Sequence, residues 1–265
     1  MSMPIPVVFI HGLWIHASSW DPWLNLFTEQ GYAPTAPGWP GEHSTTNSTR
    51  AQNAEIAGRG IVDVTTAYEQ HIDSLTARPI VIGHSFGGLI AQKLLSSGHA
   101  RAAIAIDAAG MKGVKKLPLA QLRTALPVLS RPANRTRAVS LTQKQFAYSF
   151  GNRLTRQDSD DLHTRFTIPG PARVLFEGAA ANKTQDSPAT VDVALGDRGP
   201  LLMVAGGKDH TVPASVVEEA HNLYAHSSAV TDLVHFPDRG HSLVFDAGWR
   251  EIAETTLSWL RTQGL

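Results

Sequence analysis

The stretch Pro79–Leu89, which reads PIVIGHSFGGL, decides how the rest of the chain folds. Its first four residues form a short apolar run of the kind found in buried strands, and an amphipathic segment opens at Phe86. Between the two, glycines at positions 83 and 87 flank Ser85. This spacing, after a strand and before a helix, is typical of a sharp turn that lifts a serine hydroxyl clear of the sheet. Ser85 is therefore the candidate nucleophile.

Similar apolar runs recur on both sides of this stretch and alternate with amphipathic segments. The runs predict strands at Ile5–Ile10, Pro79–Ile82, Ala102–Ile106, Leu201–Ala205 and Asp232–Phe236, with a weaker strand near Ala33–Ala36. The amphipathic segments predict helices at Ser19–Gln30, Val62–Leu75, Phe86–Ser97, Ala214–Ala225 and Ala247–Thr262. Such alternation is the signature of a doubly wound α/β fold with a mostly parallel sheet flanked by helices.

The alternation stops between about Ala108 and Gly199, where proline-interrupted helical pieces and no clear strand are found. We therefore predict a core of residues 1–107 and 200–265, with residues 108–199 inserted as a helical cap after the strand that ends near Asp107. The Pro-, Gly-, Ser- and Thr-rich segment Gly38–Asn53 predicts a long surface loop.

Two further polar side chains follow predicted strands. A serine hydroxyl needs a base, and the base needs a third group to orient it. Asp209 follows the strand Leu201–Ala205 and His241 follows Asp232–Phe236, so both should meet Ser85 at the carboxyl edge of the sheet. The chain order Ser, Asp, His also fits a nucleophile-elbow triad. Asp107 ends a strand too and is the alternative acid.

The sequence His11-Gly12-Leu13-Trp14 follows the first strand and predicts a tight turn. The backbone N–H groups of Leu13 and Phe86 would then form a two-donor oxyanion hole beside Ser85. The His11 side chain is expected to tie down the loop and to take no part in catalysis. Trp14 lies next to this hole and is the candidate pocket residue.

The composition excludes several other classes. Lys and Arg total 23, as do Asp and Glu, so no overall excess of positive charge favours nucleic acid or anionic lipid. The chain has no Cys, and it lacks zinc-protease and phosphate-loop motifs. No apolar run is long enough for a membrane span, and the first residues do not form a signal peptide. We expect a cytoplasmic protein without metal or cofactor.

Taken together, the segments around His11, Ser85, Asp209 and His241 resemble the oxyanion loop, elbow, acid loop and base loop of the α/β-hydrolase family. The resemblance implies hydrolysis without a cofactor and a cap inserted after the strand that ends near Asp107. Family members usually begin with two further antiparallel strands, but His11 is too close to the start for them. The sheet should therefore have about six strands, all parallel.

These observations predict a carboxylic ester hydrolase that cleaves a small ester or lactone through an acyl-enzyme on Ser85. The same triad also serves C–C bond hydrolases, cyanohydrin lyases and cofactor-free oxygenases, and the scaffold serves as a non-catalytic small-molecule receptor. A small-molecule substrate is the expected partner in each case except the receptor, which would take a small-molecule ligand.

Overall fold

The computed structural model describes residues 3–265, and its main sheet has six strands that all run parallel. The strand order is β2-β1-β3-β4-β7-β8. The strands are β1 (Pro6–Ile10), β2 (Ala33–Thr35), β3 (Ile80–His84), β4 (Ala102–Ile106), β7 (Leu201–Gly206) and β8 (Thr231–Phe236). Strands β1, β3, β4 and β7 are wholly buried, as continuous apolar runs predict for strands covered on both faces. The predicted fold class and the parallel six-stranded sheet are confirmed.

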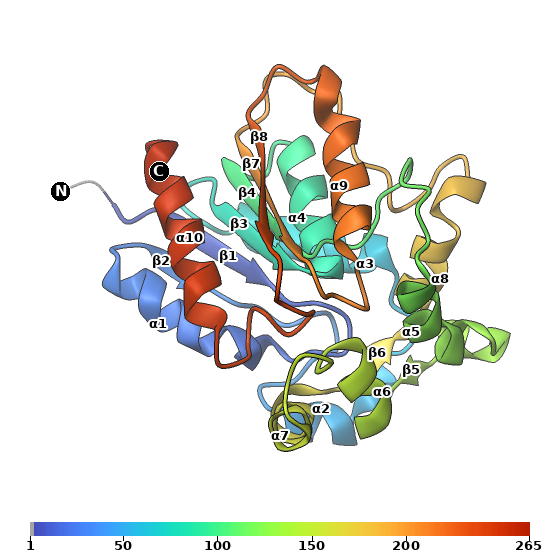
Figure 1. Ribbon diagram of the computed structural model, residues 1–265. Helices are drawn as coiled ribbons and strands as arrows, with labels where there is room; N and C mark the ends of the chain where they lie inside the picture. The colour runs from blue at the N-terminus through green and yellow to red at the C-terminus, as the bar shows by residue number, and fades with distance from the viewer. Residues whose placement is uncertain (1–2) are drawn as a thin grey trace.

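Helices cover both faces of this sheet (Figure 1). One face carries α1 (Asp21–Glu29) and α10 (Trp249–Thr262), and the other carries α3 (Ile61–Asp73), α4 (Phe86–Ser96) and α9 (Ala214–Leu223). Each of these helices begins and ends within two residues of its predicted bounds, because their apolar stripes match the helical period.

The segment 108–199 runs between β4 and β7 and lies beyond the carboxyl ends of the strands (Figure 1). It holds the helices α5 (Leu119–Leu129), α6 (Gln143–Ser149), α7 (Arg156–Phe166) and α8 (Ala172–Ala179). It also holds a small antiparallel pair, β5 (Ala138–Val139) with β6 (Gly170–Pro171). The sequence indicated no strand here, since two-residue strands are too short to produce a periodic pattern.

The predicted surface loop Gly38–Asn53 contains a helix, α2 (Thr46–Ala51). Thr45 and Ser48 form a capping box at its start. Arg50 anchors it to the inserted segment, because its guanidinium donates to the carbonyl oxygens of Thr164 and Thr167 at 2.7 Å each. Contacts distant in sequence therefore stabilise a helix whose own residues have low helix propensity.

Candidate active site

The turn at Ser85 has the strained backbone expected of an elbow. Ser85 adopts φ 57° and ψ −122°, a backbone conformation that residues other than glycine rarely adopt. A Cβ at Gly83 would lie 2.0 Å from the Gly87 carbonyl oxygen, and one at Gly87 would lie 2.2 Å from the Ile10 carbonyl oxygen. The two glycines thus permit the close crossing of β3, α4 and β1 that holds this turn.

His241 and Asp209 lie together at the carboxyl edge of the sheet, both buried. His241 Nδ1 is 2.5 Å from Asp209 Oδ2. The other carboxyl oxygen of Asp209 accepts the backbone N–H groups of Thr211 at 2.6 Å and Val212 at 2.8 Å. This network puts the imidazole proton on Nδ1. Nε2 of His241 has no hydrogen-bond partner among residues 3–265 and is left as the basic nitrogen.

Asp107 lies in the same buried cluster. Its Oδ1 accepts the Gly206 N–H at 2.6 Å, and its Oδ2 lies 4.0 Å from His241 Nδ1. Burial and the neighbouring charge of Asp209 raise the pKa of Asp107 well above its ordinary value. Burial also raises the pKa of Asp209, to about 7, while the backbone N–H groups of Thr211 and Val212 oppose this shift. Asp107 Oδ2 has no hydrogen-bond partner among residues 3–265, so Asp107 is the member of the pair that holds a proton more readily.

The pKa of His241 moves in the direction that suits a base. Burial lowers the pKa of this imidazole, and the nearby Asp107 carboxyl opposes the shift. A neutral imidazole can accept a proton, whereas an imidazolium cannot. Burial also lowers the pKa of His84 well below its usual value, and the two rings lie 4.5 Å apart between centroids. Both imidazoles are thus neutral at neutral pH.

The loop after β1 comes into contact with the elbow. A Cβ at Gly12 would lie only 2.8 Å from the Ser85 Cβ. Neither the Leu13 nor the Phe86 N–H donates a hydrogen bond to another residue among 3–265. Both residues line the same pocket as Ser85. Two unused amides beside a serine are the geometry that stabilises an oxyanion.

The His11 side chain holds this loop through a residue that sequence reasoning missed. Its Nδ1 donates to the Gly12 carbonyl oxygen at 2.9 Å, and its Nε2 lies 2.9 Å from Glu42 Oε2. His16 Nε2 lies 3.4 Å from the other carboxylate oxygen. The two histidines lower the pKa of Glu42, although burial opposes this. Glu42 stands in the predicted surface loop, where no sequence pattern distinguished it.

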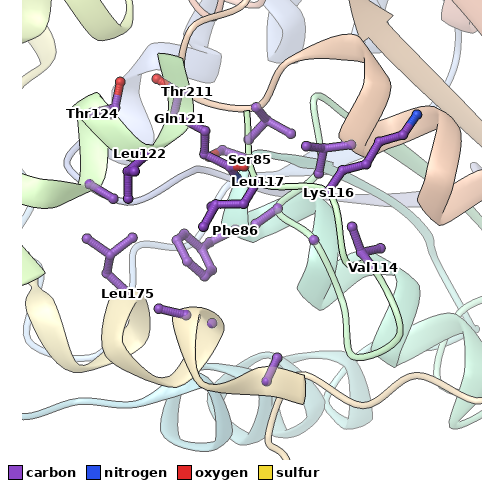
Figure 2. A pocket seen from close by; sticks show the side chains of 18 of the residues that line it. Ser85, Phe86, Val114, Lys116, Leu117, Gln121, Leu122, Thr124, Leu175 and Thr211 are labelled. Atoms are coloured by element: carbon purple, nitrogen blue, oxygen red, sulfur yellow. The ribbon is translucent and has the colours of Figure 1, made fainter. Parts of the chain in front are cut away.

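A pocket of about 240 Å³ opens beside Ser85 (Figure 2). Its wall combines Leu13, Trp14 and Phe86 from the core with Leu122 and Leu175 from the inserted segment. Trp14 therefore lies where the sequence located it. Most of the lining is apolar, which suits a substrate with a hydrocarbon part.

One buried group of metal-ligating type exists among residues 3–265. Ligand atoms of His84, Asp107 and His241 lie within 4.8 Å of one another. His241 Nδ1 in this group already bonds Asp209, and Asp107 keeps its proton. Metal ligands must be deprotonated, so the donor set suits proton transfer better than metal binding. The absence of a metal stays a prediction.

No helix within residues 3–265 combines the length and the apolar character that crossing a bilayer requires.

The fold has many counterparts among solved structures. The chain is 19% identical to a monoacylglycerol lipase from Paleococcus ferrophilus, with a TM-score of 0.65 over 99% of this chain and 97% of that one. It is 16% identical to an extracellular alpha/beta-hydrolase from a Paenibacillus species, with a TM-score of 0.68 over 96% and 98% of the chains. A methylesterase from Arabidopsis is 14% identical, with a TM-score of 0.63 over 97% and 99%.

No curated protein matches the sequence. At these identities the solved structures establish the fold and leave the substrate open. A family model described as "Alpha/beta hydrolase family" matches residues 7–255, which is nearly the whole chain and includes the elbow, the acid loop and the base loop. The chain therefore belongs to the alpha/beta hydrolase family.

Proposed function

We propose that the protein is a serine hydrolase that cleaves a small carboxylic ester or lactone. The observation that carries the proposal is the combination of Ser85, on its strained turn in the wall of an apolar pocket, with a buried His241–Asp209 pair at 2.5 Å. The ring of His241 lies 4.5 Å from that of His84, the residue that precedes Ser85. The strained turn, the pocket and the histidine–aspartate pair are each, taken alone, compatible with a purely structural role. Acyl transfer accounts for all of them together, because it requires a serine in a pocket, an oriented neutral imidazole and two unused amides.

In the proposed reaction, His241 Nε2 takes the Ser85 proton while Oγ attacks the substrate carbonyl. The Leu13 and Phe86 amides hold the negative oxygen of the tetrahedral intermediate. Asp209 keeps the proton on Nδ1 and stabilises the imidazolium that forms. The imidazolium then protonates the leaving alcohol. In the second half, His241 deprotonates a water molecule, which attacks the acyl-enzyme, releases the acid and restores Ser85.

The inserted segment supplies the outer pocket wall, so we propose that residues 108–199 act as the cap that selects the substrate. Ester chemistry is favoured over the other reactions of this triad because the lining is largely apolar. The charged residues of the lining, Lys115 and Lys116, both come from the inserted segment, and the core contributes none.

The test is covalent labelling with a fluorophosphonate, followed by intact mass and peptide mapping. We expect one label on Ser85, loss of ester hydrolysis in step with labelling, and neither event in Ser85→Ala. Ser96→Ala is the matched control, because Ser96 lies on the same helix α4 and its hydroxyl bonds the Lys93 carbonyl far from the pocket. An active enzyme labelled at another residue, or hydrolysis that persists in Ser85→Ala, would overturn the assignment.

A further inference from the structure

Helix α5, at the pocket mouth, presents leucines to the surface. Leu119 is 83% exposed and Leu126 is 53% exposed. With the partly exposed Leu122 they occupy positions i, i+3 and i+7, which form one stripe of a helix. Thr124 and Val128, on the opposite side, are the buried residues of this helix. In most amphipathic helices the apolar stripe packs onto the protein core. In α5 this stripe has no protein partner among the residues described.

The exposed leucines are concentrated in one place. Seven large apolar side chains are exposed among residues 3–265, and four of them fall within ten consecutive residues. These four, which we call the leucine patch, are Leu117, Leu119, Leu122 and Leu126. Leu117 and Leu122 also line the pocket (Figure 2). The patch is thus continuous with the entrance to the candidate active site.

The segment that carries the patch is strongly basic, although the chain as a whole is neutral. Between Met111 and Arg137 there is no Asp or Glu. Seven basic residues fall in this segment: Lys112, Lys115, Lys116, Arg123, Arg131, Arg135 and Arg137. From outside it, Glu219 accepts the backbone N–H groups of Lys115 and Lys116 at 3.0 and 2.7 Å, which leaves their ammonium groups unpaired by that carboxylate. The zero net charge therefore conceals a local positive field.

We propose that the leucine patch and its flanking cations dock the protein onto an anionic lipid surface, with the pocket mouth facing the lipid. Helix α5 itself contains one cation, Arg123, and the other six lie in the segments before and after it. Exposed leucines flanked by Lys and Arg are typical of helices that lie in a membrane interface without crossing it. Clusters of four to eight cations are the kind that anionic headgroups attract. A second copy of this chain is a poorer occupant, since a two-fold contact at this patch would bring the same cations against one another.

The docking itself needs no catalysis, but its consequence for substrates rests on the proposed function. If Ser85 cleaves small esters, an apolar ester that partitions into the lipid would pass from the lipid surface directly into the pocket. Leu117 and Leu122 would then be in contact with the lipid and with the substrate path at once.

The test is sedimentation of the protein with phosphatidylcholine vesicles, with and without phosphatidylserine. We expect binding only when phosphatidylserine is present, and its loss at high salt. Leu119→Ser with Leu126→Ser should weaken binding about 10- to 100-fold, from the apolar area that stays in water. Arg131→Gln with Arg135→Gln should weaken it roughly 25-fold, at about five-fold per cation.

Matched controls are Val62→Ser with Val230→Ser, which are exposed apolar residues elsewhere, and Arg78→Gln with Arg261→Gln. These four substitutions should leave binding unchanged. None of the substituted residues lines the pocket, so hydrolysis of a short soluble ester should be equal in all variants. Circular dichroism confirms that each variant is folded.

Equal sedimentation with both vesicle types, or equal losses in control and patch variants, would overturn the docking proposal. So would dimers in light scattering that the leucine substitutions dissolve, since the patch would then be an interface between copies. Absence of ester hydrolysis in every protein, with vesicle binding as expected, would count against the proposed function and leave the docking intact.

Discussion

At the scale of single residues, the proposed reaction depends on two buried carboxyl groups and one imidazole. Asp209 meets His241 Nδ1 at 2.5 Å, while Asp107 stays 4.0 Å from the same nitrogen. Asp209 also accepts two backbone N–H groups, whereas Asp107 accepts one. Donors stabilise the ionised form of a carboxyl, so the pKa of Asp209 is raised less, to about 7, than that of Asp107, which burial and the charge of Asp209 raise well above its ordinary value.

The first prediction compares two variants in which one or the other of these aspartates is replaced by asparagine. Asp209→Asn should lower turnover of an ester by roughly 10⁴-fold, because an amide nitrogen cannot accept the Nδ1 proton and the imidazole takes the wrong tautomer. Asp107→Asn should change turnover little, since an amide reproduces a protonated carboxyl. Steady-state kinetics on folded variants decide this. If Asp107→Asn were the crippled variant, the acid of the triad would come from β4.

The second prediction concerns stability and pH. In the unfolded chain Asp107 has the ordinary aspartate pKa of 3.8, but in the fold burial and the charge of Asp209 raise its pKa well above that value. Folding must therefore add a proton at any pH between the two, and each pH unit costs about 1.4 kcal/mol of stability. Asp107→Asn removes this cost, so it should raise the melting temperature, and more at pH 8 than at pH 5.

The control for this experiment is Asp186→Asn, an exposed acid in the inserted segment. It should leave the melting temperature nearly constant at both pH values. A melting temperature for Asp107→Asn that fell, or that rose equally at pH 5 and pH 8, would mean that Asp107 is ionised in the fold.

At the scale of elements, the inserted segment sets the outer dimensions of the pocket. Helix α8 contributes Leu175 to the pocket wall, and helix α5 contributes Leu122. Neither helix contains a candidate catalytic residue. The sheet and its loops hold the candidate catalytic residues, and the insertion provides the outer wall of the pocket beside Ser85.

The third prediction is that Leu175→Ala changes substrate preference without abolishing hydrolysis. Removal of the isobutyl group enlarges the pocket, so longer acyl chains should gain in kcat/KM relative to acetate esters, by roughly 10-fold for a matching methylene or two. A chain-length series of aryl esters measures this. Leu24→Ala on α1, a partly buried leucine outside the pocket, is the control. If Leu175→Ala scaled all esters equally, the insertion would have a structural role only.

At the scale of the whole molecule, segments from the two ends of the chain meet beneath the base loop. Trp23 on α1 is completely buried, and its Nε1 donates to the Val244 carbonyl oxygen at 2.8 Å. Its ring packs against Phe9, Trp20, Phe27 and Trp249. This cluster joins β1, α1 and α10 to the loop that carries His241.

The fourth prediction is that Trp23→Ala lowers the free energy of unfolding by about 3–5 kcal/mol, from the lost burial and the cavity left behind. Denaturant titration measures it. Trp259→Ala should cost much less, because Trp259 is only partly buried and its Nε1 bonds the Asp232 carboxylate at the surface. Equal losses in the two variants would show that the cluster around Trp23 has no special part in joining the halves of the chain.

Local sequence patterns were sufficient for the sheet and for the elbow. Buried parallel strands need apolar side chains on both faces, and the turn at Ser85 needs glycines where any Cβ would collide with β1 or α4. Both requirements act over a few neighbouring residues, so they leave a legible pattern. The positions of Asp209 and His241 followed from the same rule, since parallel strands bring their carboxyl ends to one edge.

Other features were decided only by the tertiary structure. Helix α2 forms because Arg50 bonds the inserted segment more than a hundred residues away, which no local pattern encodes. Glu42 became a buried partner of His11 and His16 for the same reason. The sequence favoured Asp209 over Asp107 as the acid, and the structure adds the distances to His241 Nδ1, 2.5 Å and 4.0 Å, that support this proposal. Hydrogen bonds and ion pairs between distant segments depend on how the chain packs, whereas strands and turns depend on their own side chains, and this difference in range separates what the sequence determined from what it left to the fold.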